Sequence, residues 1–186
     1  MPSAFSDTPA EMLPAVQALR IGQQHYTDGR LDEAILAFRH GLERAGADAD
    51  VATISDLHAN LGNAYMLRGL LDPAGASYKA ALTLSPHLAG CWCNLATIHL
   101  RTGRAQDAIT LYLEALSLLG VGADEAVVFE DSPNGVRAAK AAGIFTVAVP
   151  NEVTRELGLD AAGADLLLDS LADLPPEELL SRLAAA

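Results

Sequence analysis

Two adjacent carboxylates, Glu130 and Asp131, follow directly on the apolar residues 126–129. A run this short and apolar fits a buried parallel strand. Residues 132–135, with the sequence Ser-Pro-Asn-Gly, favour a turn directly after it. Two carboxylates at the carboxyl end of such a strand suit a hard cation that keeps several of its waters. The pattern therefore predicts a cation-binding corner.

Two amides form a second candidate site, because Asn60 and Asn94 lie 34 residues apart in equivalent surroundings. Each stands directly before a leucine, and Asn63 is a further candidate close by. An amide side chain both donates to and accepts from a peptide backbone, so it can hold an extended segment with little regard for its sequence. A chance or purely structural origin is the alternative, because the preceding copy of the pattern has Arg20 at this position.

The elements that would position these amides repeat along the chain. The alignment is anchored on Gly29, Gly69 and Gly103, and each copy has an alanine five residues later, an aromatic nine later and a leucine thirteen later. These shared positions are Ala34, Ala74 and Ala108, then Phe38, Tyr78 and Tyr112, then Leu42, Leu82 and Leu116. The first interval is six residues longer than the second, which predicts an insertion within residues 46–55.

Each copy is interpreted as two antiparallel helices, with the small residues allowing close approach and the glycine ending the first helix. The pattern resembles the tetratricopeptide repeat over about residues 15–119, and Trp92 stands at the family's tryptophan position. The resemblance implies a helical array whose first helices line a concave groove for a peptide or protein partner, with Asn60, Asn63 and Asn94 as groove residues. The predicted segments are 1–14, an array over 15–120 (repeats at about 15–48, 55–88 and 89–120), and 121–186.

The last segment changes character, because strand and helix patterns alternate in it. We expect a βαβ unit with very short strands, and hence a mostly α protein that ends in a partial Rossmann-like α/β fragment. The expected strands and helices are 126–129, 135–142, 145–149, 166–168 and 176–183.

Residues 127–143 resemble the acidic motif and following helix of haloacid dehalogenase-like hydrolases, in the phosphatase and phosphoglucomutase branch. That resemblance implies that Glu130 and Asp131 hold Mg²⁺. This sequence departs from the family's pattern at the other catalytic positions. The nucleophilic Asp, the Ser/Thr and the Lys are not found, and Gln106 lies near the expected lysine position. Asp48 and Asp50 have the nucleophile's spacing but follow no apolar strand, so we interpret them as a coincidence. We therefore expect no catalytic residue.

The join between the two patterns falls on residues 112–116, which satisfy the second helix of the repeat and also resemble the helix before the acidic strand. One helix serving both registers suggests a chimeric fusion, natural or engineered. The acidic strand has lost the neighbour that the family resemblance implies, and an unpaired edge favours association. We expect the last segment to pack on the third hairpin, to pair with another copy of the chain, or to remain partly disordered.

The composition restricts the class of partner. The net charge of −12 opposes nucleic-acid binding, and the two cysteines suit a reducing compartment. The chain shows no leader and no long apolar run, so we expect a soluble, cytoplasmic protein that does not contact a membrane. The sequence favours a protein interaction module with a non-catalytic hydrolase remnant. The alternatives are a Mg²⁺-dependent phosphatase or sugar-phosphate mutase, complete by itself or completed by another chain, and a fusion product without a selected role.

Overall fold

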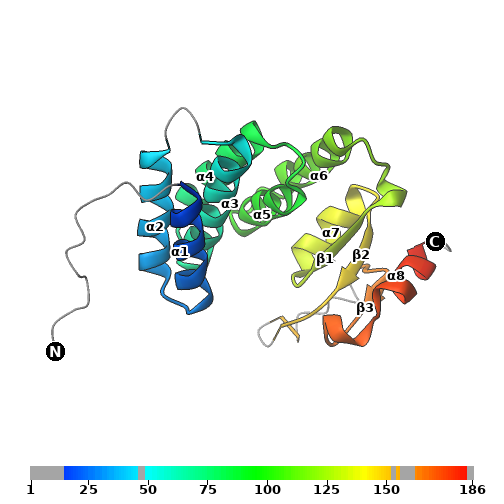
Figure 1. The fold of residues 1–186 in the computed structure, drawn as a ribbon. Helices are drawn as coiled ribbons and strands as arrows, with labels where there is room; N and C mark the ends of the chain where they lie inside the picture. Colours follow the sequence, from blue (N-terminus) through cyan, green and yellow to red (C-terminus); the bar gives the residue numbers. More distant parts are fainter. Residues whose placement is uncertain (1–14, 46–48, 152–153, 156–161, 184–186) are drawn as a thin grey trace. The chain divides into compact units, whose positions relative to one another are not determined.

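A computed structural model describes residues 15–45, 49–151, 154–155 and 162–183 (Figure 1). The predicted segment 1–14 lies outside these residues. The chain divides into two compact units, Met1–Ser85 and Pro86–Ala186, and each unit is described by itself.

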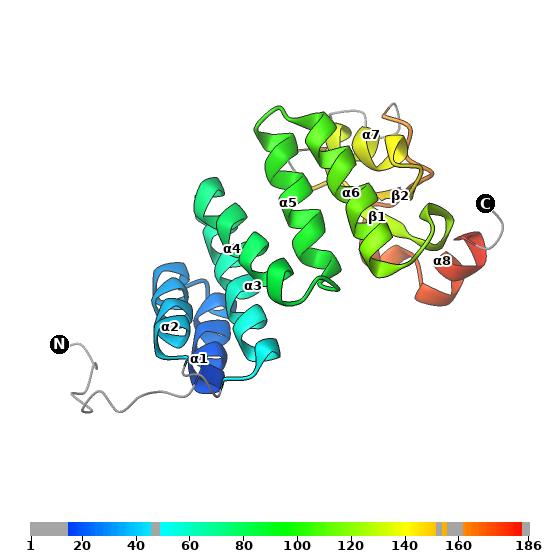
Figure 2. The ribbon, with the colours of Figure 1, turned by 90° about the horizontal axis from the view of Figure 1, so that it is seen from above.

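The described part of the first unit consists of helices that pair as two hairpins, as the repeat pattern predicts (Figures 1 and 2). The helices are α1 (Ala15–Thr27), α2 (Leu31–Arg44), α3 (Val51–Leu67) and α4 (Leu71–Leu84). The turn glycines Gly29 and Gly69 both have φ +74°, a left-handed conformation that residues with a side chain rarely adopt. This conformation ends the first helix of each hairpin and reverses the chain.

A small residue against an aromatic ring sets the distance between the two helices of a hairpin. The rings of Phe38 and Tyr78 are fully buried and lie against Gly22 and Gly62 of the preceding helices. A Cβ on Gly62 would lie 2.6 Å from the ring of Tyr78, and a Cβ on Gly22 would overlap the ring of Phe38. The glycines therefore allow an approach that even alanine would obstruct.

Only a part of the predicted insertion at residues 46–55 connects the first two hairpins, and the rest belongs to a helix. Residues 46–48, and with them Asp48, lie outside the described residues, but α3 already begins at Val51. Asp50 is the N-cap of α3, because its carboxylate accepts from the Thr53 N–H (2.8 Å) and from the Thr53 hydroxyl (2.6 Å). The insertion thus adds a turn to the helix, and Asp50 has a capping role.

The second unit joins the third hairpin to the α/β segment. Its described elements are α5 (Ala89–Arg101), α6 (Ala105–Leu119), η1 (Ala123–Glu125), β1 (Val127–Glu130), α7 (Pro133–Ala141), β2 (Phe145–Ala148), β3 (Leu166–Leu167), η2 (Leu171–Asp173) and α8 (Pro176–Leu183). The strands form a parallel sheet in the order β1-β2-β3, which confirms the expected βαβ arrangement. Strand β1 runs one residue further than predicted, so that Glu130 lies within the strand and pairs with Ala148.

The core of the second unit is shared between the third hairpin and the sheet. Tyr112 and Leu100 of the hairpin lie in one buried cluster with Val128 of β1 and Ala138 and Ala139 of α7. The α/β segment thus packs on the third hairpin and covers its apolar face, which is one of the three expected outcomes. The compact units divide at Ser85, whereas the repeat pattern places a boundary at residue 120. The boundary between the compact units therefore differs from the boundary that the repeat pattern predicts.

Strand β1 is one edge of the described sheet and β3 is the other, because among the described residues each pairs with β2 alone. Phe129, on the outer face of β1, is 45% exposed. Self-association through the β1 edge stays a prediction.

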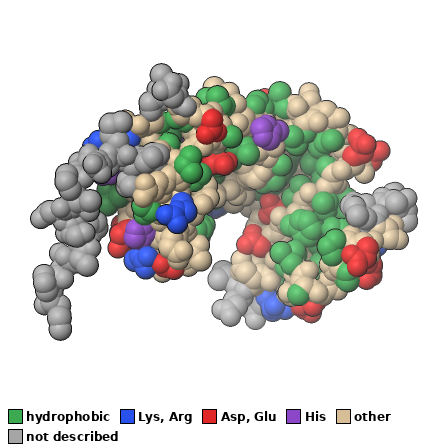
Figure 3. Space-filling model, viewed as in Figure 1, with side chains coloured by type: hydrophobic (Ala, Val, Ile, Leu, Met, Phe, Trp, Pro, Cys, Tyr) green, Lys and Arg blue, Asp and Glu red, His purple; other side chains and the backbone are tan. Residues whose placement is uncertain are grey.

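Charged side chains are scattered over the face of the molecule that Figure 3 draws. On the face drawn in Figure 3, the basic side chains of the described residues form no continuous patch, and acidic side chains lie on both units. Within the described residues, no helix combines the length and the hydropathy that a bilayer span needs.

Candidate functional site

Strand β1 directs Glu130 into the protein. Alternate side chains of a strand point to opposite faces, so Glu130 shares a face with Val128, which is 7% exposed in the core. Phe129 lies between them and points to the outer face. The carboxyl group predicted to hold a cation therefore points towards the third hairpin.

Both oxygens of the Glu130 carboxyl group have partners. The Tyr112 hydroxyl of α6 donates to Oε1 at 3.0 Å, and the Ser132 hydroxyl donates to Oε2 at 3.3 Å. The same carboxyl group lies over Gly135 in the first turn of α7, so closely that a Cβ there would overlap it. Glu130 thus contacts α6 and α7 together.

The surroundings of Glu130 disfavour its charge. Burial raises the pKa of Glu130 and the charge of Asp131 adds to this, although the hydrogen bond from Tyr112 acts in the opposite direction. Burial also raises the pKa of Tyr112 far above its usual range, and the charge of Glu130 adds to it. The pKa of the neighbouring Cys93 thiol is raised for the same two reasons. These three groups form a polar cluster between the hairpin and the sheet, in which Tyr112 is buried and Glu130 and Cys93 are half-buried.

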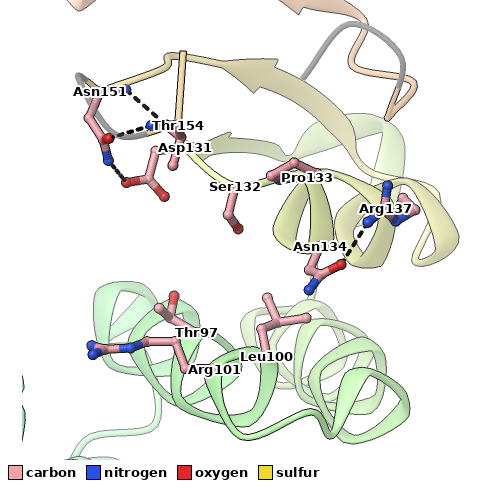
Figure 4. Close-up of a pocket in the computed structure, with 10 residues that line it drawn as sticks. All are labelled: Thr97, Leu100, Arg101, Asp131, Ser132, Pro133, Asn134, Arg137, Asn151 and Thr154. Carbon is pink, nitrogen blue, oxygen red and sulfur yellow. Dashed lines mark hydrogen bonds between the residues drawn. The ribbon is translucent and has the colours of Figure 1, made fainter. Parts of the chain in front are cut away.

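Asp131 lies on the other side of the strand end, at the surface. Its Oδ2 accepts a hydrogen bond of 2.7 Å from Nδ2 of Asn151, which follows β2 (Figure 4). The adjacent carboxyl groups therefore have separate partners, one inside the protein and one outside. Among the described residues, no group of three or more His, Cys, Asp or Glu side chains is arranged to hold a metal.

The residues present therefore do not fit the family's Mg²⁺ site. A divalent cation bound by both carboxylates would have to take Glu130 from Tyr112 and Ser132 and from its position over Gly135. We derive no chemistry through a metal at this corner, and Mg²⁺ binding by Glu130 and Asp131 stays a prediction.

A pocket of about 830 Å³ opens beside Asp131, between α5 and the turn that leads from β1 into α7. Figure 4 shows Ser132 and Asn134 pointing from this turn towards Thr97 and Leu100 of α5. The sequence did not point to this pocket, because its walls come from segments that are about thirty residues apart.

The predicted groove residues lie on first helices of their hairpins. Asn60 and Asn63 lie on α3 in the first unit, and Asn94 lies on α5 in the second, each half-buried. Nδ2 of Asn60 donates to the carbonyl oxygen of Asp56 at 2.8 Å. Oδ1 of Asn63 accepts from the buried Tyr78 hydroxyl at 2.8 Å, which gives Asn63 a structural role. The groove function of the three amides stays a prediction.

The tyrosine of the second helix has a different hydrogen-bond partner in the second and in the third copy of the repeat. Tyr78 and Tyr112 are equivalent, and Tyr78 donates to Asn63 within its own hairpin. Thr97 stands where the third copy would need the matching amide, and Tyr112 donates instead to Glu130 of the sheet. The loss of that asparagine is the sequence signal that points to a new partner for Tyr112.

Comparison with known proteins supports both halves of this description. The tetratricopeptide repeat family matches residues 55–88 and 89–118. The chain resembles the first tetratricopeptide domain of Spaghetti (RPAP3), solved bound to an HSP90 peptide, with a TM-score of 0.52 at 16% identity over 72% of this chain and 93% of that one. This likeness concerns the fold. The chain therefore contains tetratricopeptide repeats in a helical array.

The curated proteins that are similar in sequence include two for which a phosphatase-type relationship is informative. Protein CbbY (plasmid) of Cupriavidus necator is 30% identical over 177 residues, which are 95% of this chain and 63% of that protein. The putative phosphatase YhcW of Bacillus subtilis is 45% identical over 73 residues, 39% of this chain and 32% of that protein. The chain thus spans less than two thirds of the length of either relative. The similarity of this chain to haloacid dehalogenase-like phosphatases therefore extends over only a part of such a phosphatase.

Proposed function

We propose that this protein is an interaction module whose repeats bind a peptide or a protein partner, and that its α/β segment is not catalytic. The repeats support the first part, and a solved structure of similar fold holds a peptide. An acidic chain with scattered basic groups suits a protein partner better than a nucleic acid.

The single observation that carries the second part is the hydrogen bond from Tyr112 to Glu130. A phosphoryl-transfer site needs its charged groups directed at the phosphoryl group and its metal. Here the first carboxyl group of the pair is directed at a repeat helix and has partners at both oxygens. The hydrogen bonds of the Glu130 carboxyl group therefore stabilise the packing of the hairpin on the sheet.

Asn60 and Asn94 are the residues that we assign to the partner's backbone. The side chain of Asn60 uses one N–H on its own helix, so its other N–H and its carbonyl oxygen can pair with a peptide. Asn94 stands one repeat later, at the equivalent position of the third hairpin.

The test is a pull-down from an immobilised peptide library with the full chain. We expect captured peptides to be lost or strongly reduced with the Asn60→Ala/Asn94→Ala double variant. Gln106→Ala is the matched control, because it removes an exposed amide from α6, a second helix, and it should retain every captured peptide. Equal capture by the double variant would contradict the assignment of the groove.

The alternative function is a Mg²⁺-dependent phosphatase or sugar-phosphate mutase. It is favoured by the two similar curated proteins and by the exposed carboxylate of Asp131 at a strand end. Hydrolysis of p-nitrophenyl phosphate with Mg²⁺ separates the two proposals, and we expect none above the metal-only background. Turnover that is lost in Asp131→Ala but kept in Asn60→Ala would establish the alternative.

A further inference from the structure

The pocket beside Asp131 offers polar groups on both walls. Ser132 and Asn134 contribute a hydroxyl and an amide from the β1–α7 turn, and Thr97 contributes a hydroxyl from α5. The Asn134 amide oxygen accepts from Arg137 at 2.7 Å, which leaves its nitrogen directed towards α5 (Figure 4). The Ser132 oxygen already accepts from the Gly135 N–H, and its hydroxyl donates to Glu130. The Thr97 oxygen can accept from a peptide N–H, and the Asn134 nitrogen can donate to a peptide carbonyl.

Two cations of this pocket have no ion-pair partner among the residues that the structure describes. They are Arg101 of α5 and Arg137 of α7, both exposed. By contrast, Lys140, Arg155 and Arg182 in the same unit are all paired with carboxylates. Arg104 of this unit also lacks an ion pair within the described part of the chain but lies outside the pocket. Two arginines against the single carboxylate of Asp131 give the pocket a net positive charge, which favours a ligand of negative charge.

The placement of the arginines selects the shape of the ligand. In Figure 4, Arg101 and Arg137 lie on opposite sides of the view, with Ser132 and Asn134 between them and Thr97 beside Arg101. A ligand that pairs with both of them has to offer negative charge at two places. An extended peptide can do so, because its residues advance about 3.3 Å each and its backbone offers donors and acceptors along the way.

We propose that this pocket binds an extended acidic segment of a partner protein, with carboxylates near Arg101 and Arg137 and its backbone against Ser132, Asn134 and Thr97. The volume of about 830 Å³ lies in the usual range for a ligand site, roughly 300–1,000 Å³. The proposal depends on the proposed function only in taking a peptide as the ligand. It does not require the groove of Asn60 and Asn94.

Asp131 opposes this ligand at one end. In Figure 4 it lies on the same side of the pocket as Arg101, on the opposite wall, so its charge repels a carboxylate placed there. Removing that charge in Asp131→Asn should therefore strengthen the binding of an acidic peptide. A metal-dependent phosphate site predicts the opposite, because there Asp131 would hold the cation.

The experiment titrates the isotope-labelled full chain with the blocked pentapeptide Glu-Gly-Ser-Gly-Glu. The side-chain Nε–Hε signals of Arg101 and Arg137 report on binding by NMR. We expect saturable shifts at both arginines and a dissociation constant about tenfold weaker for the Gln-Gly-Ser-Gly-Gln peptide. Arg101→Gln and Arg137→Gln should each weaken binding about fivefold, and Asp131→Asn should tighten it about twofold.

Arg104→Gln is the matched control, because Arg104 is also exposed and free of described ion pairs but lies outside the pocket. It should bind the acidic peptide as the unchanged chain does. The proposal would be overturned if the two peptides bound equally well, or if Arg104→Gln weakened binding as much as Arg137→Gln. Displacement of the peptide by equimolar inorganic phosphate would overturn it too. The Asn60→Ala/Asn94→Ala variant should bind this peptide normally, so that failure of the groove and failure of the pocket are distinguishable.

Discussion

The hydroxyl of Tyr112, on a repeat helix, donates a 3.0 Å hydrogen bond to the carboxyl group of Glu130, on the first strand of the sheet. The bond joins two sequence patterns that resemble different families, and it lies inside their common core. In the second repeat the equivalent Tyr78 bonds to Asn63 of its own hairpin. The α/β segment has thus taken over a contact that a repeat otherwise makes within itself.

Tyr112→Phe should destabilise the second unit, because it leaves a half-buried carboxyl oxygen without its donor. We expect the free energy of unfolding to fall by about 1–3 kcal/mol. Trp92 is the chain's one tryptophan and lies on α5, so its fluorescence during urea unfolding reports on this unit. Tyr78→Phe is the control: it should move the circular dichroism transition of the first unit and leave the Trp92 transition in place. A Trp92 transition that is unchanged in Tyr112→Phe would show that the bond contributes nothing.

The stability of the second unit should depend on pH through Glu130. Its pKa is raised in the folded state from an ordinary value of 4.5, so the folded state binds the proton more tightly than the unfolded chain does. Its contribution is complete below about pH 4.5 and is lost as the pH rises through the folded pKa. As the pH rises above about 4.5, the urea midpoint of Trp92 fluorescence should therefore fall.

Glu130→Gln should remove this dependence, because the amide oxygen can still accept from Tyr112 but does not ionise. The variant should be at least as stable as the unchanged chain at pH 7. Asp165 does not interfere: although burial alone would raise its pKa, Lys140 and the Thr146 N–H lower it, so its effect appears only at more acidic pH. A slope that persists in Glu130→Gln would assign the pH dependence to another group.

Gly135→Ala should disrupt the contact between Glu130 and α7, because the added Cβ would overlap the carboxyl group. We expect a loss of about 1–3 kcal/mol in the unfolding free energy, measured by urea unfolding. Gly90→Ala is the matched control in the same unit: nothing lies within 4 Å of its Cβ position, so it should be neutral or stabilising by about 0.5–1 kcal/mol. Combining Gly135→Ala with Glu130→Ala should recover part of the loss, and an additive loss would exclude the steric explanation.

Gly62→Ala tests the packing of the repeat itself. A methyl group there lies 2.6 Å from the fully buried ring of Tyr78, so α3 and α4 must move apart. We expect a destabilisation of about 1–3 kcal/mol in the first unit by circular dichroism, without a shift in the Trp92 transition. The third copy already has Ala96 at this position, so a tolerated Gly62→Ala would mean that the second hairpin adjusts as the third has.

The repeat helices could be predicted because their determinants are local. Glycine, alanine and aromatic positions recur at fixed intervals, and each has its expected role in the turn or between the helices. The start of α3 was missed because residues 46–55 were interpreted as one polar insertion. The capping pair Asp50 and Thr53 was the signal that a helix begins there.

The site was predicted less well, because it depends on contacts between distant segments. The apolar run 126–129 predicts a strand that ends before Glu130. In the structure the strand includes Glu130, which therefore lies on the same face as Val128. Arg101 and Arg137 lie on helices 36 residues apart in the chain, and nothing in their spacing indicates a common pocket. Only the packing of the hairpin on the α/β segment brings them together.

The central claim is that Glu130 belongs to the packing of the third repeat and is not a metal ligand. Titration of the chain with Mg²⁺, observed through the side-chain carboxyl ¹³C signals of Glu130 and Asp131, tests it most directly. We predict no saturable shift at Glu130 up to about 10 mM Mg²⁺, with the Tyr112 ring signals unchanged. Saturable shifts of both carboxyl signals, together with movement of the Tyr112 ring, would show that the acidic pair still binds a cation and would contradict the account.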